Sequence, residues 1–219
     1  MPELNTQKFF DHYAVDFDAI YGNRNGAIDS VVNRVFRQSM KQRFEMTIAG
    51  CSPAEGRKVL DIGCGPGHYS VALAQRGAQV LGIDFAESMI NIAETRAAAA
   101  QVNDDCEFRV ADWTTFPASQ TFDYVLALGF MDYVANAAET VAKIVSLTSD
   151  RAFLSFPAAG GILGWQRKLR YRYHHHCELF LYSEEQLRNL FSKTPRAQIT
   201  ITPISRDFFV TISTEPTKH

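Results

Sequence analysis

Cysteine is scarce in this sequence, and its cysteines follow no recognised pattern. Only four occur among 219 residues, Cys51, Cys64, Cys106 and Cys177. They form no CxxC pair and no zinc-like spacing, and a chain of this length does not need disulfide bonds in order to fold. The sequence therefore argues against a zinc module and a disulfide-stapled secreted domain, and a reducing, cytoplasmic environment is expected.

The chain also lacks a clear excess of either charge and any long apolar run. It has 22 basic and 24 acidic residues, whereas proteins that bind nucleic acids usually carry a basic excess. Charges interrupt the amino-terminal stretch MPELNTQKFFDHYAVDF, so neither a signal peptide nor a membrane span is expected there or later. Of all residues, 46% are hydrophobic, which is enough for one sizeable core. No nucleic-acid partner is expected.

From Lys58 onward, short β-rich runs alternate with helix-like stretches, a pattern typical of a doubly wound α/β fold with a mostly parallel sheet. The expected strands are residues 58–62, 79–83, 106–110, 122–128, 151–156, 198–202 and 207–213. The expected helices are residues 68–76, 86–100, 137–147 and 184–191. Because only a few residues join the last two strands, they are expected to form an antiparallel hairpin.

The chain is expected to form one domain with a cap. Residues 1–50 are the predicted helical cap, and residues 51–219 are the predicted core, with an insertion at about 157–182. The cap's second helix, about 29–48, carries Val31, Val32, Val35, Phe36 and Met40 on a packing face and Arg34, Arg37 and Lys41 facing away.

The most informative segment is VLDIGCGPG at residues 59–67, a hydrophobic run that leads into a glycine-rich turn opening a helix. Gly67 follows Gly65 by two residues instead of three, and no lysine follows, unlike dinucleotide and phosphate loops. Asp61 would repel a pyrophosphate but attract the ammonium and sulfonium of S-adenosylmethionine. The segment predicts a site for this methyl donor, and a turn that serves only tight packing is the alternative.

Two further acids follow predicted strands. Asp84 ends the run VLGID about twenty residues after the glycine turn, where a carboxylate can accept hydrogen bonds from both hydroxyls of a ribose. Taken alone, it is equally well a turn residue or a cap for the helix at Ala86. Asp112, before Trp113, is placed to accept a hydrogen bond from an adenine amino group, and a plain turn acid is the alternative.

Together, VLDIGCGPG, VLGID, the acid after the third strand and FDYVLALG resemble the ordered motifs of the class I S-adenosylmethionine-dependent methyltransferases. The resemblance implies a Rossmann-like, seven-stranded sheet whose last strand is antiparallel. It implies that Asp61, Gly63 and Gly65 surround the methionine part, Asp84 the ribose and Asp112 the adenine, with Leu128 and Gly129 beside the methyl group. The full predicted cofactor-binding set is Asp61, Gly63, Cys64, Gly65, Gly67, Asp84, Phe85, Met89, Asp112, Trp113 and Leu128.

A narrower likeness concerns the last third of the chain. The runs LTSDRAFLSF (147–156), YSEE (182–185) and RDFF (206–209) are similar to magnesium-protoporphyrin O-methyltransferases, which esterify a propionate. The acceptor is therefore expected to be a small molecule, anionic or hydroxylated. A hydroxyl acceptor needs a base and a carboxylate does not. The candidate bases are Asp132, His12 and His174, although Asp132 is equally well a turn acid.

The insertion is basic and aromatic. Trp165, Leu169 and Tyr173 recur every four residues among Arg167, Lys168, Arg170 and Arg172, as expected for a lid helix. A solvated surface helix and a peripheral membrane contact are the alternatives. The adjacent His174, His175 and His176 cannot all face one ion, so no metal site is expected.

Two other classes of function remain open on sequence alone. A nicotinamide-dependent oxidoreductase is disfavoured by the glycine spacing and Asp61. A non-catalytic module that binds the donor is less consistent with the intact loop.

Overall fold

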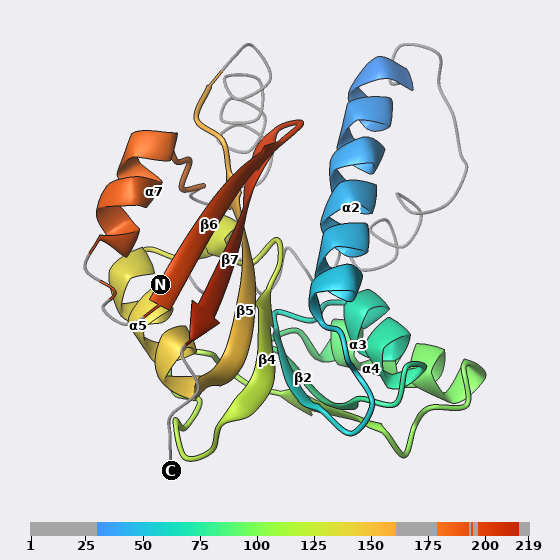
Figure 1. Ribbon diagram of the computed structural model, residues 1–219. Helices are drawn as coiled ribbons and strands as arrows, with labels where there is room; N and C mark the ends of the chain where they lie inside the picture. The colour runs from blue at the N-terminus through green and yellow to red at the C-terminus, as the bar shows by residue number, and fades with distance from the viewer. Residues whose placement is uncertain (1–29, 161–178, 193, 195–196, 215–219) are drawn as a thin grey trace.

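A seven-stranded sheet forms the centre of the protein (Figure 1). The computed structural model describes residues 30–160, 179–192, 194 and 197–214, with side chains from residue 38 onward. The strand order is β3-β2-β1-β4-β5-β7-β6. The strands are β1 (Lys58–Ile62), β2 (Gln79–Asp84), β3 (Cys106–Val110), β4 (Phe122–Ala127), β5 (Thr148–Pro157), β6 (Ala197–Ile204) and β7 (Asp207–Thr214).

The sheet is parallel from β3 to β5 and antiparallel at β7 and β6. The short link between β6 and β7 allows only a hairpin, which confirms the predicted antiparallel ending. Because β1, β2, β4 and β5 run parallel, their carboxyl ends share one edge of the sheet. In such folds ligands bind at this edge.

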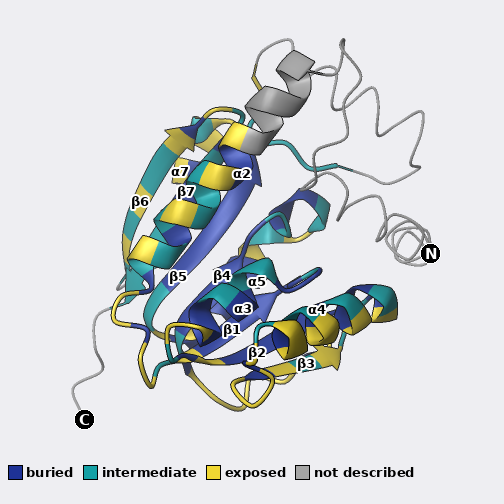
Figure 2. Cartoon of the chain, turned by 90° about the vertical axis from the view of Figure 1, so that its right-hand side faces the viewer, coloured by how far each residue is buried: buried dark blue, intermediate teal, exposed yellow. Residues whose placement is uncertain are grey.

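Helices cover both faces of the sheet. Figure 1 shows α2 (Ser30–Gly50) and α3 (His68–Ala74) on one side and α5 (Ala137–Leu147) and α7 (Glu184–Phe191) on the other, while α4 (Glu87–Ala99) lies beside α3. Successive residues of β1 enter different cores, Val59 on the α3 side and Leu60 on the α5 side. Both are fully buried, as the dark sheet in Figure 2 shows. The continuous apolar runs of the sequence reflect this two-sided burial.

The long helix α2 lies along β5. Met40 is buried, as expected for the packing face, and Lys41 is exposed, as expected for the opposite face. The other side chains of this prediction lie outside the described residues: Val31, Val32, Arg34, Val35, Phe36 and Arg37. Near the end of α2, a β-carbon built on Gly50 would lie only 2.5 Å from the Phe153 ring. The Phe153 ring therefore packs directly against the backbone of the helix.

Four predicted elements have the bounds that the structure shows, residues 58–62, 106–110, 137–147 and 184–191, and the other described elements differ by one to three residues. Two of the larger differences lie in the first helix of the core and in the fifth strand. The helix expected over 68–76 ends at Ala74, because the chain turns through Gln75 toward Gly77, whose φ is +83°. The strand expected over 151–156 begins at Thr148, directly after α5, and includes Pro157, which pairs with Asp207. A capping box begins α7, since the Ser183 side chain accepts a hydrogen bond from Gln186 N and the Gln186 side chain accepts one from Ser183 N.

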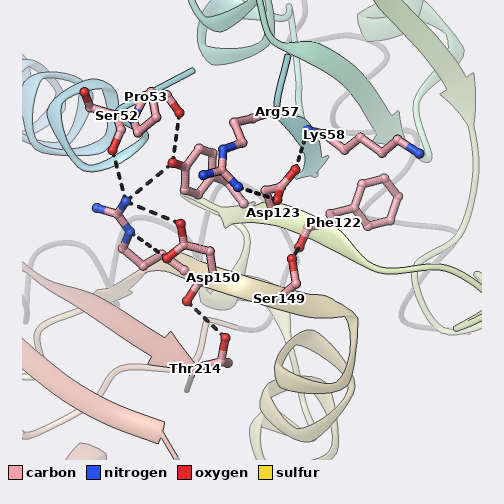
Figure 3. A network of polar contacts seen from close by, with 11 residues as sticks. Ser52, Pro53, Arg57, Lys58, Phe122, Asp123, Ser149, Asp150 and Thr214 are labelled. Carbon is pink, nitrogen blue, oxygen red and sulfur yellow. Dashed lines mark hydrogen bonds and ion pairs between the residues drawn. The ribbon is translucent and has the colours of Figure 1, made fainter. Parts of the chain in front are cut away.

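A polar network closes the amino-terminal edge of the sheet (Figure 3). Arg57 pairs with Asp123 at 2.9 Å, and the Tyr124 hydroxyl donates to the carbonyl oxygen of Pro53, also at 2.9 Å. Arg151 donates to Ser52 O at 3.0 Å, which ties the loop after α2 to the sheet. These contacts stabilise the edge of the sheet opposite the carboxyl ends of the parallel strands.

In the described part of the chain, no helix is both long and apolar enough to cross a membrane. No three histidine, cysteine, aspartate or glutamate side chains of this part come together in a way that could hold a metal ion.

Candidate donor and acceptor site

The glycine-rich loop lies between β1 and α3 at the carboxyl edge. Gly63, Gly65 and Gly67 all have positive φ values, +64°, +51° and +75°. A β-carbon on Gly67 would lie 2.9 Å from Ala93 of α4, so this glycine serves close packing. A β-carbon on Gly65 would meet no atom within 4 Å, so its backbone faces open space where a ligand can approach.

Asp84 joins the end of β2 to this loop. Its Oδ2 accepts a hydrogen bond from Gly65 N at 3.0 Å, and its Oδ1 accepts one from Ala86 N at 2.9 Å. The side chain is only 8% exposed. Each carboxylate oxygen has two lone pairs, so the carboxylate retains capacity to accept hydroxyl donors. Asp84 therefore positions the loop and caps α4, which does not exclude the predicted contact with a ribose.

Asp61 is buried beneath the loop. It is 2% exposed, and its Oδ2 accepts a hydrogen bond from the Ser70 hydroxyl at 2.7 Å. Burial raises the pKa of this carboxyl from 3.8 to about 6; the Ser70 hydrogen bond opposes the rise, and the negative charge of Asp84 adds to it. The arrangement favours a nearby cation, which would stabilise the ionised form.

The raised pKa predicts how Asp61 affects the stability of the ligand-free protein. A carboxyl with a higher pKa in the folded chain stabilises the fold when protonated; this contribution is complete below about pH 4 and is lost as pH rises through about 6. Asp61→Asn should therefore be more stable than the parent at about pH 8, by roughly 1–3 kcal/mol, with a smaller difference at about pH 5. Urea unfolding at both pH values measures this, and a pH-independent difference would contradict it.

Aromatic and apolar side chains form the β4 side of the candidate site. A β-carbon on Gly63 would lie 3.0 Å from the Phe130 ring, so that ring covers the start of the loop. The Trp113 ring meets Phe130 edge-on with centroids 6.3 Å apart, and Lys143 Nζ lies 4.4 Å from the Trp113 ring centroid. Leu128 is 9% exposed at the end of β4. Through Phe130 the structure thus brings Gly63 and Trp113 to one region, whereas Leu128 belongs to the core on the α3 side of the sheet.

The remaining predicted cofactor residues have different settings. Cys64 is buried, and its Sγ would lie 3.1 Å from a β-carbon on Gly82, so its side chain faces the core. Met89 is buried against Ala86 in a small cluster of its own, and Phe85 is half-buried. Asp112 is exposed, and its Oδ1 accepts from both the amide and the hydroxyl of Thr114 at 2.8 Å. This turn contact corresponds to the alternative considered for Asp112.

Asp132 is the middle residue of a short 3-10 helix, Met131–Tyr133, which follows β4 after a three-residue turn. It is 5% exposed, and its backbone oxygen accepts from Phe180 N at 2.9 Å. Burial raises the pKa of Tyr182, and the charge of Asp132 adds to the rise, so these two groups are neighbours. Its role as a base stays a prediction. His12, His174 and the basic segment 165–176 lie outside the described residues.

Two residues that the sequence did not single out reach the same edge. Ser155, on β5, accepts hydrogen bonds from Gly129 N at 2.7 Å and from Arg43 Nη1 at 3.1 Å. A β-carbon on Gly129 would lie 3.7 Å from Arg43 Nη1. The available sequence signal was the four-residue spacing of Ser39, Arg43 and Thr47, a polar row on an otherwise apolar helix face.

Comparison with known proteins identifies relatives of the chain. A family model described as a methyltransferase domain matches residues 53–158. The ubiquinone biosynthesis O-methyltransferase of Rhizobium johnstonii is 30% identical over 186 residues, which cover 78% of this chain and 75% of that protein. The protein of the same name from Rhizobium etli is 34% identical over 151 residues, 63% of this chain and 60% of its own length.

A solved structure shows the same fold over nearly the whole chain. Magnesium protoporphyrin IX methyltransferase from Synechocystis, with bound SAH, superimposes with a TM-score of 0.79. The match covers 97% of this chain and 100% of that chain at 21% sequence identity. At this identity the likeness establishes the fold alone, and the seven-stranded arrangement agrees with it.

Proposed function

Because this chain belongs to the class I S-adenosylmethionine-dependent methyltransferases, we propose that it transfers the donor's methyl group to an oxygen atom of a small-molecule acceptor. S-adenosylmethionine, when bound, supplies an electrophilic methyl group on its sulfonium. The observation that carries the proposal is the open face of Gly65, held by Asp84 above the buried carboxyl of Asp61. The protein's main tasks are then alignment of the acceptor and exclusion of water.

The residues at the carboxyl edge fit the donor in charge and shape. In this proposal Asp61, Gly63 and Gly65 surround the methionine part, Asp84 holds the ribose hydroxyls and Asp112 receives the adenine amino group. The raised pKa of Asp61 supports the first assignment, because a cation beside a buried carboxylate offsets the cost of its ionisation. The position of Asp84 at the carboxyl end of β2, beside Gly65 N, supports the second. Of the other predicted residues, Gly67, Phe85, Met89, Trp113 and Leu128 contribute packing or apolar wall, and Cys64 contributes through its backbone.

The acceptor is proposed to meet the donor beside Gly129 and Phe130. The relatives from Rhizobium are named as O-methyltransferases, which supports an oxygen as the methylated atom. The runs shared with magnesium-protoporphyrin methyltransferases support an anionic acceptor, and the Rhizobium relatives are equally compatible with a hydroxylated one.

Binding of S-adenosylhomocysteine tests the donor site first. This product should raise the melting temperature, because a ligand that binds only the native state stabilises it by mass action, about 2.7 kcal/mol at a hundredfold excess over Kd. NAD at the same concentration serves as the control and should leave the melting temperature unchanged. No shift with S-adenosylhomocysteine would remove the donor assignment, and a shift with NAD alone would favour an oxidoreductase.

Methyl transfer itself requires a second measurement. With methyl-labelled S-adenosylmethionine and a metabolite extract of the source organism, label should enter small molecules and be released by ester or ether cleavage. Donor binding without any transfer of label would favour a non-catalytic module. Label bound to carbon or nitrogen would contradict the proposed transfer to an oxygen atom.

A further inference from the structure

One face of α2 is fastened along β5 and β7 as far as the carboxyl edge. Ser39 Oγ donates to Asp207 Oδ2 at 2.8 Å, and Arg43 Nη1 donates to Ser155 Oγ, one helical turn further along α2. Gly50 lies against Phe153 near the end of the helix. Phe153 and Ser155 share a face of β5, since side chains two apart on a strand point the same way. The guanidinium of Arg43 is thereby held at the end of β5.

The hydrogen bonds that Ser155 accepts leave its hydroxyl able only to donate one hydrogen bond. An arginine and a backbone amide can only donate, so Ser155 Oγ accepts both of its contacts, from Arg43 and Gly129, and both of its lone pairs are used. The side chain is 1% exposed, and within the described residues its hydroxyl hydrogen has no acceptor. A hydroxyl that accepts from a cation is polarised toward donating. Arg43 and Ser155, the donor pair, therefore both offer hydrogen-bond donors.

This donor pair lies next to the proposed reaction site. Arg43 Nη1 would be 3.7 Å from a β-carbon on Gly129, and Gly129 precedes Phe130, whose ring covers Gly63 of the glycine loop. Donors grouped at one point suit an oxyanion, whereas a neutral hydroxyl acceptor would require a base there to take its proton.

Given the proposed methyl transfer to oxygen, on which this inference rests, we propose that Arg43 and the Ser155 hydroxyl bind a carboxylate of the acceptor. One carboxylate oxygen accepts from the guanidinium and the hydroxyl. The other forms the new bond to the methyl carbon as the carbon–sulfur bond breaks, and that electron pair stays on sulfur. One negative and one positive charge cancel, so the products are a neutral ester and a thioether, and no proton is transferred. Arg43 is then a specificity-determining residue.

Benzoate and benzamide are suitable probes, because they have nearly the same shape and differ in charge. In calorimetric titrations of the full chain saturated with S-adenosylhomocysteine, benzoate should bind at least about tenfold more tightly than benzamide. Arg43→Gln should remove this preference, and Arg43→Lys should retain part of it, because a point charge replaces the fork of donors. Ser155→Ala, which keeps the guanidinium, should weaken the binding of benzoate and leave the binding of benzamide unchanged.

Ser39→Ala is the matched control, because it loosens the same helix without altering the donor pair. If Arg43 served only to fasten α2, Arg43→Gln and Ser39→Ala would both lower the melting temperature and leave the benzoate preference unchanged. That result would overturn the inference, as would equal affinity of the parent protein for both probes. If Arg43→Gln fails to fold, Arg43→Lys and Ser155→Ala decide in the same way.

Labelled extracts separate failure of this inference from failure of the proposed function. The extract is divided on an anion exchanger before the reaction, and label should enter the retained, anionic fraction and decrease at least tenfold with Arg43→Gln. Label confined to the unretained fraction would overturn the carboxylate site while methyl transfer stands. Label in neither fraction, with S-adenosylhomocysteine still bound, would refute the proposed function and this inference with it.

Discussion

Replacement of Gly65 by valine is expected to reduce affinity for S-adenosylhomocysteine at least 100-fold while the chain still folds. Apart from the adjacent residues, no described part of the chain lies within 4 Å of a β-carbon at this position, so the added side chain enters the open space where the ligand is proposed to bind. The φ value of +51° is strained for a branched residue, which should lower stability by about 1–3 kcal/mol. Calorimetric titration measures the affinity, and circular dichroism confirms the fold.

Gly56 supplies a control with the same backbone conformation. Its φ is +68°, a β-carbon there would also meet nothing within 4 Å, and it lies before β1, away from the carboxyl edge. Gly56→Val should lose similar stability and bind S-adenosylhomocysteine like the parent. Equal losses of affinity in both variants would mean that strain, and not contact with the ligand, controls binding, and the donor would have to bind elsewhere.

Replacement of Asp84 by alanine is expected to weaken donor binding by roughly 1–3 kcal/mol, because charge-assisted hydrogen bonds to the ribose would be lost. The fold should also lose stability, since the amides of Gly65 and Ala86 lose their acceptors. These two effects need separate measurements, because a loosened loop could by itself lower affinity.

The 2′-deoxy analogue of S-adenosylhomocysteine separates them. If Asp84 contacts the ribose hydroxyls, the parent protein should prefer S-adenosylhomocysteine to this analogue, and Asp84→Ala should lose most of that preference. A preference that persists in the variant would leave Asp84 as a residue that positions the loop and caps α4, with no direct contact to the ligand.

The sequence was most informative where local chemistry determines structure. The bounds of β1, β3 and α5 were predicted to the residue, because each is a short run with a clear pattern of apolar residues bordered by turn residues. The capping box at Ser183 is likewise a local pattern. The glycine loop was identifiable because spacing and the charge of Asp61 distinguish it from phosphate-binding turns.

The donor pair could not be predicted, because it depends on residues that meet only in the folded chain. Arg43 and Ser155 are 112 residues apart, and nothing near Ser155 marks its hydroxyl as different from others on buried strands. Cys64 shows the opposite case. Its neighbours Gly63 and Gly65 face the proposed site, but its own side chain points into the core, and a motif alone does not give that direction.

The buried carboxyl of Asp61 links the lifetime of this protein to the supply of its methyl donor. Without ligand, the ionised carboxyl opposes folding near neutral pH, so the unfolded fraction is larger than in a chain with a neutral residue there. A bound cation removes that opposition and adds its own binding free energy. Because cellular proteases remove unfolded chains continuously, donor starvation should lower the abundance of this enzyme before any change in its synthesis.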